Sequence, residues 1–561
     1  MSRNFTGDVI FDTLRQNKGL TLGLAGAVLA VAGLALAPPQ LLRLLIDRHL
    51  VPGRSEGIVW LALAYTLTLL LSGAAGFLKG ALLTACGQKI IRGLRQRMME
   101  KLSRVKATYF TQNPTGVTAS RFIADVENVN TLFSDGLVSM LVDCLKIIGI
   151  AVSIFCFSFR LGLLTLLLIP AVFGVSRFFR SRMLKAQTAN LEQVGLVNNQ
   201  LDESVKNAAM IKVFHKEAYM EERFGLALEE NFRTKERVNL YSSCYAPVIQ
   251  LLRSAAIVLV VLLSSSQMNL LGMSLGMAAA AIDLITGLLG PIESLGTELQ
   301  SLQKGISGIR RLNAFWREEE EAPKAEGFRW REFFAAGPGE IRFEDLSFAY
   351  EADHPVLRNI DLVIRKGESV TITGRTGVGK TTMFNLIMGL LEPSRGRLLI
   401  NGVDACRIPN REKRRLFGYV EQDFQFVSGS VARQVSLGDP EISPRKIREV
   451  CEFVGLRQYI EELPEGFDTV TGDGSEFSWG QRQLLATARA LAADPAILLL
   501  DEITANLDSG TEEKVISVLR RAGQGRTILS ISHRLARALA SQRIIRLEEG
   551  KISGEVLPKP R

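Results

Sequence analysis

The sequence predicts a chain of two parts, an all-α polytopic membrane domain followed by an α/β domain. Two observations lead to this prediction. Apolar stretches long enough to cross a bilayer recur through the first half of the 561 residues, whereas short β-branched runs alternate with amphipathic helical runs in the second half. A charged stretch rich in glycine and proline separates the two patterns. We therefore expect a membrane domain over residues 1–316, a linker over 317–339 and the α/β domain over 340–561.

The membrane prediction depends on the length of the apolar stretches. A helix needs about 20 predominantly apolar residues to cross the hydrocarbon core of a bilayer. A single stretch of this kind could be a buried core helix, but six of them in one half of a chain favour six membrane spans. The six stretches are approximately 19–46, 58–83, 137–159, 161–179, 246–266 and 268–292.

The net charge of +9 could indicate either a nucleic acid or a membrane as partner. The basic residues, however, gather in the two long connections that follow the second and fourth apolar stretches. By the positive-inside rule, these connections, the N-terminus and the C-terminal domain face the cytoplasm. Membrane topology therefore explains the charge, and we expect a lipid bilayer and no nucleic acid as partner. Six cysteines without a CxxC pair argue against a disulfide framework and a zinc site.

The two long connections are strongly helical in composition, and each exceeds forty residues. At about 1.5 Å per residue, helices that continue out of the membrane would extend tens of Å into the cytoplasm. Asn113-Pro114-Thr115-Gly116 indicates a turn in the first connection, and Phe214-His215-Lys216-Glu217 a polar break in the second. Each connection would thus present a short helix at its cytoplasmic tip.

The C-terminal domain contains the P-loop pattern GxxxxGK[ST], between an expected strand over 369–373 and an expected helix over 381–391. Its backbone N–H groups would surround phosphates, and the helix N-terminus would add positive potential. Lys380 would reach the β- and γ-phosphates, and Thr381 would bind Mg²⁺. The motif therefore predicts a P-loop ATPase domain with ATP and Mg²⁺ as cofactors. The expected ATP-binding residues here are Gly374, Arg375, Thr376, Gly377, Val378, Gly379, Lys380, Thr381 and Thr382.

A pair of carboxylates follows the apolar run Ala496–Leu500. A buried strand that ends in Asp501-Glu502 beside a P-loop would place Asp501 on Mg²⁺ and Glu502 next to the attacking water, as catalytic base. The alternative is a strand that simply ends in a solvated acidic pair.

The segment just upstream of that strand reads Phe477-Ser478-Trp479-Gly480-Gln481-Arg482-Gln483. It resembles the signature of ATP-binding-cassette (ABC) proteins, LSGGQ followed by RQ, and together with the P-loop it identifies the domain as resembling an ABC ATPase. The resemblance implies that Ser478, Gly480 and Gln481 contact ATP.

Other family motifs follow in the family's order along this chain. Tyr350 resembles the A-loop aromatic residue that stacks on adenine. Gln422 resembles the Q-loop glutamine, which implies contacts with ATP and Mg²⁺. Ala505-Asn506-Leu507-Asp508 resembles the D-loop. His533 resembles the switch histidine that contacts the γ-phosphate, which implies a catalytic role.

The first half resembles the family as well. Six helices ahead of one cassette resemble a half-transporter of the exporter-type (type IV) fold, and Tyr109–Val129 resembles its first coupling-helix region. The resemblance implies ATP-driven transport by a dimer in a bacterial plasma or inner membrane, with each ATP between the P-loop of one subunit and the signature of the other. Export is the leading expectation. Import on the same fold, as of metal–siderophore complexes, and a non-transport ATPase or sensor remain alternatives.

The signature departs from the family pattern at two positions. Trp479 stands where the family usually has glycine, and Phe477 where it usually has leucine. Glu502 and His533, which would serve this subunit's own nucleotide, match the pattern. This combination favours a heterodimer with a second half-transporter subunit over a homodimer.

Ionisable residues inside a membrane usually face an aqueous cavity or pair with one another. Arg43, Asp47 and Glu293 lie near the ends of stretches, and Asp143 and Lys146 are spaced to pair. The candidates for a substrate cavity are Lys79, Arg253 and Asp283. These residues do not identify the substrate.

Overall fold

The structure is a computed structural model that describes residues 4–264, 273–321, 324, 333, 339–351, 354–472, 476–503, 507–531 and 543–556. The chain forms two compact units. The first, here called the membrane unit, comprises Met1–Ser103 and Thr115–Glu318. The second, the ATPase unit, comprises Arg104–Pro114 and Glu319–Arg561. The segment Arg104–Pro114 thus groups with the ATPase unit, although in sequence it interrupts the membrane unit.

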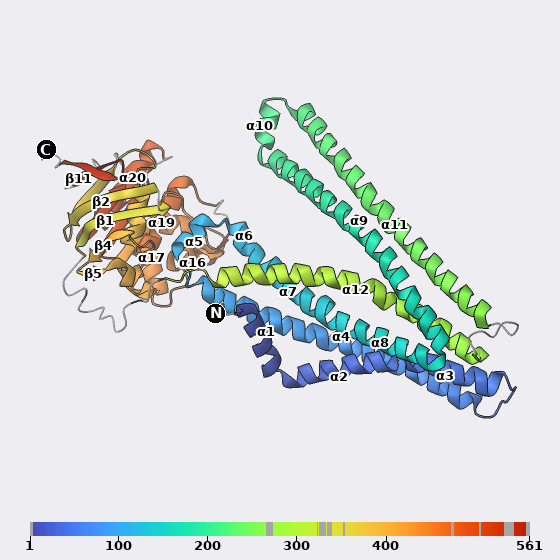
Figure 1. The fold of residues 1–561 in the computed structure, drawn as a ribbon. Coiled ribbons are helices and arrows are strands. Elements are labelled where there is room, and N and C mark those ends of the chain that lie inside the picture. Colours follow the sequence, from blue (N-terminus) through green and yellow to red (C-terminus); the bar gives the residue numbers. More distant parts are fainter. Residues whose placement is uncertain are drawn as a thin grey trace. The chain divides into compact units, whose positions relative to one another are not determined.

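Long helices form the membrane unit (Figure 1). They are α1 (Phe5–Gln16), α2 (Lys18–Leu34), α3 (Ala37–Leu45), α4 (Ile58–Leu102), α6 (Thr115–Ser120), α7 (Val126–Thr131), α8 (Ser139–Phe157), α9 (Phe159–Lys206), α10 (Ala208–Val213), α11 (Glu217–Ser264) and α12 (Leu275–Trp316). π-helical turns at Ile46–Leu50, Arg121–Asp125 and Leu132–Val138 continue α3, α6 and α7 without a break.

Six helical stretches in the described residues are long and apolar enough to cross a membrane, which confirms the predicted six-helix domain. They run over Lys18–Leu50, Ile58–Leu102, Thr115–Phe157, Phe159–Lys206, Glu217–Ser264 and Leu275–Trp316. Most continue well beyond the predicted spans, because the polar segments next to the spans are helical too. The last helix begins at Leu275, and residues 265–272 lie outside the described part of the chain.

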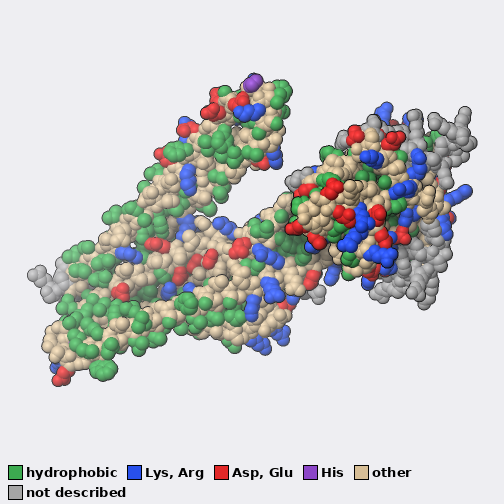
Figure 2. Space-filling view, turned by 180° about the vertical axis from the view of Figure 1, so that it is seen from behind, with side chains coloured by type: hydrophobic (Ala, Val, Ile, Leu, Met, Phe, Trp, Pro, Cys, Tyr) green, Lys and Arg blue, Asp and Glu red, His purple; other side chains and the backbone are tan. Residues whose placement is uncertain are grey.

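The core of the membrane unit lies along α12. Leu284, Ile285, Leu288 and Leu289 form one stripe at helical spacing, and all four are almost completely buried. By contrast, α4 exposes large apolar side chains such as Phe77, which is 80% exposed. Hydrophobic side chains cover much of the helix surface in Figure 2. An apolar exterior of this kind suits contact with lipid.

Two helical connections extend beyond the predicted spans, and each is formed by a pair of helices. In one pair, α9 and α11 lie side by side and the short α10 closes their tip, where charged side chains gather (Figures 1 and 2). The break predicted at Phe214–Glu217 separates α10 from α11. The other connection turns through the short helix α5 (Ala107–Gln112), and Asn113 and Pro114 separate α5 from α6.

The ATPase unit contains two larger sheets and a small one. The four-stranded sheet has the order β2 (His354–Ile364), β1 (Ile341–Glu351), β4 (Arg395–Ile400), β5 (Val403–Asp404). The six-stranded sheet has the order β12 (Lys551–Val556), β11 (Arg543–Glu548), β3 (Ser369–Thr373), β10 (Thr527–Ile531), β9 (Ile497–Asp501), β6 (Phe417–Val420). The small sheet pairs β7 (Gly429–Ser430) with β8 (Val470–Thr471).

Helices cover both faces of the six-stranded sheet. The helices described in this unit after β3 are α14 (Lys380–Ile387), α15 (Asn410–Leu416), α16 (Val431–Ser436), α17 (Pro444–Phe453), α18 (Arg457–Glu461), α19 (Trp479–Leu491) and α20 (Ser509–Ala522). Along β9, Ile497 and Leu499 join the core that contains α14, whereas Leu498 and Leu500 join the core that contains α19 and α20. Because both faces are covered, the strand is apolar at every position before Asp501.

The strands from β11 to β6 are parallel, and β12 is an antiparallel edge strand. The predicted α/β domain with a largely parallel sheet is therefore confirmed. Parallel strands bring their carboxyl ends to one edge of a sheet, where ligands usually bind. Here the chain leaves β3 into the P-loop, β9 into Glu502 and β6 into the segment that contains Gln422.

Candidate functional site

The P-loop connects β3 to α14, as its motif predicts. Gly374, Gly377 and Gly379 have φ angles of 156°, 85° and 105°, which favour glycine. The Lys380 ammonium curls back and donates to the carbonyl oxygens of Gly374 at 2.9 Å and Arg375 at 3.1 Å. It also lies 3.8 Å from the Glu502 carboxylate. The loop thus surrounds a lysine that is placed to meet a phosphate.

Asp501 lies at the carboxyl end of β9 and is only 6% exposed. Its Oδ2 atom accepts hydrogen bonds from the hydroxyls of Thr381, at 3.3 Å, and Tyr419, at 3.2 Å. Burial raises the pKa of Asp501, and the two hydroxyl donors oppose that rise because they stabilise the ionised form. The structure therefore brings Thr381 and Asp501 together as the sequence predicted, and it adds Tyr419.

Glu502 follows Asp501 in a left-handed conformation, with φ at 42°, which is uncommon for a residue with a side chain. Its backbone N–H donates to the carbonyl of Ile531 on β10 at 3.0 Å, which holds this conformation. The side chain is 41% exposed and close to Lys380. A strained residue fixed beside the P-loop is consistent with a functional role.

Tyr350 lies near the end of β1 with its ring 39% exposed. Its hydroxyl is 3.3 Å from the Thr382 hydroxyl, so the aromatic ring stands beside the start of α14. Gln422 lies just beyond β6 and is exposed. Its backbone carbonyl accepts a hydrogen bond from the Gln483 side chain of α19 at 2.7 Å, which connects this segment to the signature helix.

Signature residues form the N-terminus of α19. Ser478 and Gln481 make a reciprocal capping box, in which Ser478 N–H donates to Gln481 Oε1 at 2.8 Å and Gln481 N–H donates to Ser478 Oγ at 3.3 Å. A Cβ atom on Gly480 would lie 2.1 Å from the Thr511 side chain, so α19 and α20 approach closely there. The capping box therefore defines where α19 begins.

The two unusual signature residues have different surroundings. Phe477 is 2% exposed and packs against the rings of Phe426 and Tyr459, so an aromatic side chain fits this core position. Trp479 is 48% exposed, and its ring lies beside the Arg482 guanidinium. Its bulk therefore projects from the start of α19.

The structure does not join the signature to the P-loop within this chain. No hydrogen bond or ion pair in the described ranges links Ser478, Gly480 or Gln481 to residues 374–382. His533, Ala505 and Asn506 lie outside the described residues. Sequence reasoning missed Tyr419, although a tyrosine in a short apolar strand directly before Glu421-Gln422 was a usable signal.

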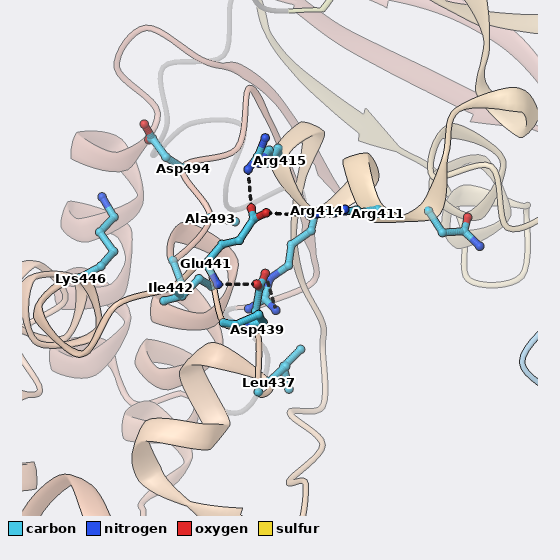
Figure 3. A pocket seen from close by; sticks show the side chains of 14 residues that line it. Arg411, Arg414, Arg415, Leu437, Asp439, Glu441, Ile442, Lys446, Ala493 and Asp494 are labelled. Carbon is cyan, nitrogen blue, oxygen red and sulfur yellow. Dashed lines mark hydrogen bonds and ion pairs between the residues drawn. The ribbon is translucent and has the colours of Figure 1, made fainter. Parts of the chain in front are cut away.

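A separate hollow of about 760 Å³ lies at the amino ends of β6 and β9, away from the P-loop edge (Figure 3). Arg411 and Arg415 of α15 both reach Glu441, and Arg414 pairs with Asp439 at 3.4 Å. Each of these arginines thus pairs with a nearby carboxylate, and the hydrogen bonds from Arg411 and Arg415 lower the pKa of Glu441. We therefore interpret the ion pairs around this hollow as a structural link between α15 and the Asp439–Glu441 segment.

The charges in the membrane unit differ in their surroundings. Asp47 accepts from the Gly276 backbone N–H at 2.8 Å and from the Ser274 hydroxyl at 2.5 Å, so it caps the start of α12. Arg43 lies 3.9 Å from Asp47, and Lys146 lies 3.9 Å from Asp143.

The three cavity candidates lie on separate helices: Lys79 on α4, Arg253 on α11 and Asp283 on α12. No hydrogen bond or ion pair in the described part of the chain joins any two of them. Asp283 is exposed, whereas the Nε atom of Arg253 is buried and has no hydrogen-bond partner in the described ranges.

Six membrane helices and a nucleotide site at the carboxyl edge of a parallel sheet define the class of membrane transport ATPases. Comparison with known families agrees. Residues 22–292 match the model described as ABC transporter transmembrane region, and residues 357–505 match the model described as ABC transporter.

Known proteins are similar over nearly the whole chain. An ATP-dependent lipid A-core flippase of Nitrosococcus oceani is 31% identical over 86% of this chain and 80% of its own length. A fatty acid ABC transporter ATP-binding/permease protein of Mycobacterium tuberculosis is 29% identical over 97% of this chain and 86% of its own. The solved structure of a bacterial Atm1-family ABC exporter with ATP bound matches with a TM-score of 0.76 and 23% identity, over 97% of this chain and 95% of that one.

The chain therefore belongs to the ABC transporter family. It is a half-transporter with the exporter-type fold: a multi-pass membrane protein that binds ATP and couples ATP hydrolysis to transport. Half-transporters of this kind work as dimers.

Proposed function

We propose that this chain exports a lipid-like, amphipathic substrate, as one half of a heterodimer in a bacterial inner membrane, with its N-terminus and ATPase unit in the cytoplasm. The observation that supports the substrate class is the similarity, over most of the chain, to proteins named lipid A-core flippase and fatty acid transporter. Both names denote molecules with an apolar part and a polar head. The exporter-type fold supports the direction.

The P-loop edge is the proposed site of ATP hydrolysis. Residues 374–382 hold the phosphates, with the Lys380 ammonium free to exchange its backbone carbonyl partners for phosphate oxygens. Tyr350 stacks on the adenine, while Ser478, Gly480 and Gln481 contact the nucleotide of the partner subunit. Glu502 acts as general base towards the attacking water, and His533 contacts the γ-phosphate.

Mg²⁺ would be held by Thr381, Asp501 and Gln422. Thr381 Oγ1 and Asp501 Oδ2 lie 3.3 Å apart at the mouth of the P-loop, and hard oxygen ligands of this kind fit the ion. When bound, Mg²⁺ neutralises charge on the phosphates. The protein holds these ligand oxygens in place. Tyr419 and Thr381 orient the Asp501 carboxylate by hydrogen bonds, and the burial of Asp501 excludes competing water.

A heterodimer is favoured by the asymmetry within this chain. Its P-loop, Asp501 and Glu502 are arranged for hydrolysis, whereas the exposed Trp479 ring projects from the signature helix. In the dimer, Trp479 would approach the partner's nucleotide. The site that uses this chain's P-loop and the partner's signature would then be the competent one.

Lys79, Arg253 and Asp283 remain the proposed lining of the transport pathway. The buried, unpartnered Nε of Arg253 supports this role for Arg253. Alanine variants of the three should change substrate stimulation of ATPase and leave basal hydrolysis near normal. A variant that loses thermal stability, or that transports like wild type, would remove that residue from the pathway.

Direction and substrate class are tested together in inverted membrane vesicles. ATP-dependent accumulation of a fluorescent fatty acid inside inverted vesicles, abolished by Glu502→Gln, is the expected result. ATP-dependent uptake into right-side-out cells without accumulation in inverted vesicles would establish import instead. ATP hydrolysis with no movement of this probe or of a labelled phospholipid would contradict the lipid-like substrate.

A further inference from the structure

A hollow of about 260 Å³ lies inside the membrane unit, between α9, α11 and α12. Its polar lining comes from all three helices, and its apolar wall is Met183, Leu184 and Val238. The polar residues are Ser176, Arg180, Gln187, Ser242, Tyr245, Thr297 and Gln300. Pockets for whole drug-sized ligands usually measure about 300–1,000 Å³, so this hollow suits one polar group rather than a complete lipid.

Arg180 carries the charge of the hollow. One of its terminal nitrogens donates to the backbone carbonyl of Glu293 at 2.5 Å. No carboxylate in the described residues lies within ion-pairing distance of its guanidinium. A partly buried cation without an anionic partner is costly, and an anionic ligand would offset that cost.

The fold makes room for this guanidinium. A Cβ atom on Gly296 of α12 would lie 0.8 Å from Nη1 of Arg180, so only glycine allows the side chain to cross α12 there. Elsewhere in the lining, the hydroxyls of Ser176 and Tyr245 are 3.2 Å apart and together supply donors and acceptors. The hydrogen bond to Glu293 and the space at Gly296 therefore hold the guanidinium against α12.

A second arginine strengthens the positive potential. Within the described residues, Arg253 has a buried Nε without a hydrogen-bond partner. Both arginines interact electrostatically with the Glu293 carboxylate, so two cations share this one anion. Net positive charge between helices suits phosphate or carboxylate headgroups.

The expected position of the hollow in the bilayer also suits a lipid headgroup. Its residues lie in 176–187, 238–245 and 297–300, at the ends of the predicted spans 161–179, 246–266 and 268–292. By the positive-inside rule these are cytoplasmic ends, where lipid headgroups lie. Leu184, which lines the hollow, is 48% exposed, so an alkyl chain could leave the hollow along it.

We propose that this hollow binds the anionic headgroup, phosphate or carboxylate, of an amphipathic molecule, and that Arg180 is the residue that recognises it. The guanidinium offers two parallel N–H groups to such an anion. The inference rests on the proposed function, because it assigns the headgroup of the proposed lipid-like substrate to one place in the fold.

The test uses the full-length chain in phosphatidylcholine nanodiscs, with dodecyl phosphate as the probe. Arg180→Gln removes the charge, Gly296→Ala displaces the guanidinium without changing the charge, and Arg182→Gln is the matched control. Arg182 lies on the same helix but packs over the Phe178 ring, outside the hollow. We expect dodecyl phosphate to bind at least about tenfold more weakly to Arg180→Gln and Gly296→Ala, and within about twofold of wild type to Arg182→Gln.

Two further probes identify the source of the anion. Dodecanol, which has the chain without the charge, and inorganic phosphate, which has the charge without the chain, should each fail to displace dodecyl phosphate. Displacement by inorganic phosphate at equal concentration would overturn the amphipathic ligand, and displacement by dodecanol would overturn the anionic one. Equal loss of binding in the Arg182 control would also overturn the assignment. If Gly296→Ala does not fold, the comparison of Arg180→Gln with the Arg182→Gln control decides whether the assignment holds.

Transport measurements separate this inference from the proposed function. If Arg180-dependent binding is found but ATP moves no lipid-like probe, the site stands and the proposed function fails. If ATP moves such a probe equally well in the Arg180 and Arg182 variants and binding is unchanged, the function stands and the site is wrong.

Discussion

The hydroxyl of Tyr419 donates a hydrogen bond to Oδ2 of Asp501 over 3.2 Å. The two residues lie on adjacent parallel strands, β6 and β9. Burial raises the pKa of Asp501, and this donor lowers it towards the ordinary range. Tyr419 thus helps to keep the carboxylate ionised at the mouth of the P-loop.

Tyr419→Phe should move the acid limb of the ATPase pH profile to higher pH. Without the donor, the ionised form of Asp501 is less stable, so its pKa rises further and the protonated form persists to higher pH. The profile should be measured at fixed free Mg²⁺. Tyr459→Phe is the control, because that hydroxyl donates to the Glu476 carbonyl and makes no hydrogen bond to Asp501 among the described residues. An unchanged acid limb in Tyr419→Phe would show that the hydrogen bond does not tune Asp501.

Glu502→Gln should abolish turnover and retain ATP binding. Removal of a general base typically lowers the rate by about 10²–10⁴-fold, whereas the neutral isostere keeps the shape of the site. ATPase rate and nucleotide affinity should be measured on the same preparation. Glu461→Gln, which removes a surface carboxylate of α18 paired with Arg457, is the control. Activity of Glu502→Gln within about threefold of wild type would be incompatible with a general base at this position.

The chain expressed alone should hydrolyse ATP slowly, because in a self-dimer each P-loop would face a signature that bears Trp479. Trp479→Gly removes the exposed ring and should raise this rate by about tenfold, equivalent to ~1.4 kcal/mol of activation free energy. Trp479→Phe keeps much of the bulk and should stay slow. Robust, substrate-stimulated ATPase by the wild-type chain alone would establish a homodimer.

Arg311→Met should lower the stability of the membrane unit. The Asp125 side chain is 5% exposed and accepts bonds from Arg311 at 2.6, 2.9 and 3.0 Å, so loss of the arginine leaves a buried carboxylate unpaired. We expect a cost of about 1–3 kcal/mol, less than for a fully buried pair because Arg311 is half exposed.

The double variant with Asp125→Asn should be more stable than Arg311→Met alone, since it removes the orphaned charge. Thermal midpoints of wild type and both variants in one detergent test this. A double variant less stable than Arg311→Met would contradict the pairing argument.

Stability should rise with pH through the titration of Lys413. Burial lowers the pKa of this amine to about 8, and its ammonium donates to the Gly389 carbonyl at 3.0 Å. An unfolded lysine titrates near about 10.4, so between these values the unfolded chain binds more protons and folding gains as pH increases.

The thermal midpoint of the full-length chain, measured from about pH 7.5 to about pH 9.5, should therefore climb in wild type and climb less in Lys413→Met. Lys514→Met on α20 is the control, because that lysine is exposed. Equal slopes in wild type and Lys413→Met would exclude Lys413 as the source.

The sequence by itself determined the class of fold and the chemical nature of the ATP site. Span length, charge asymmetry and the GxxxxGK[ST] pattern are local properties, because a bilayer thickness and a phosphate cradle each set requirements on a few consecutive residues. The six helices and the parallel sheet confirm the predicted fold class. Roles for individual residues, such as Glu502, Gln422 and His533, remain predictions.

Only the tertiary structure decided which distant residues meet. Tyr419 reaches Asp501 because β6 lies next to β9, and Asp47 caps α12 across the membrane unit. Arg180 faces Gly296 because α9 is rotated towards α12. Strand order and helix rotation are set by the packing free energy of the whole core, which sums many weak contacts between segments far apart in the chain. Hydrophobic periodicity within one segment carries none of that information, so these relationships could not be read from the sequence.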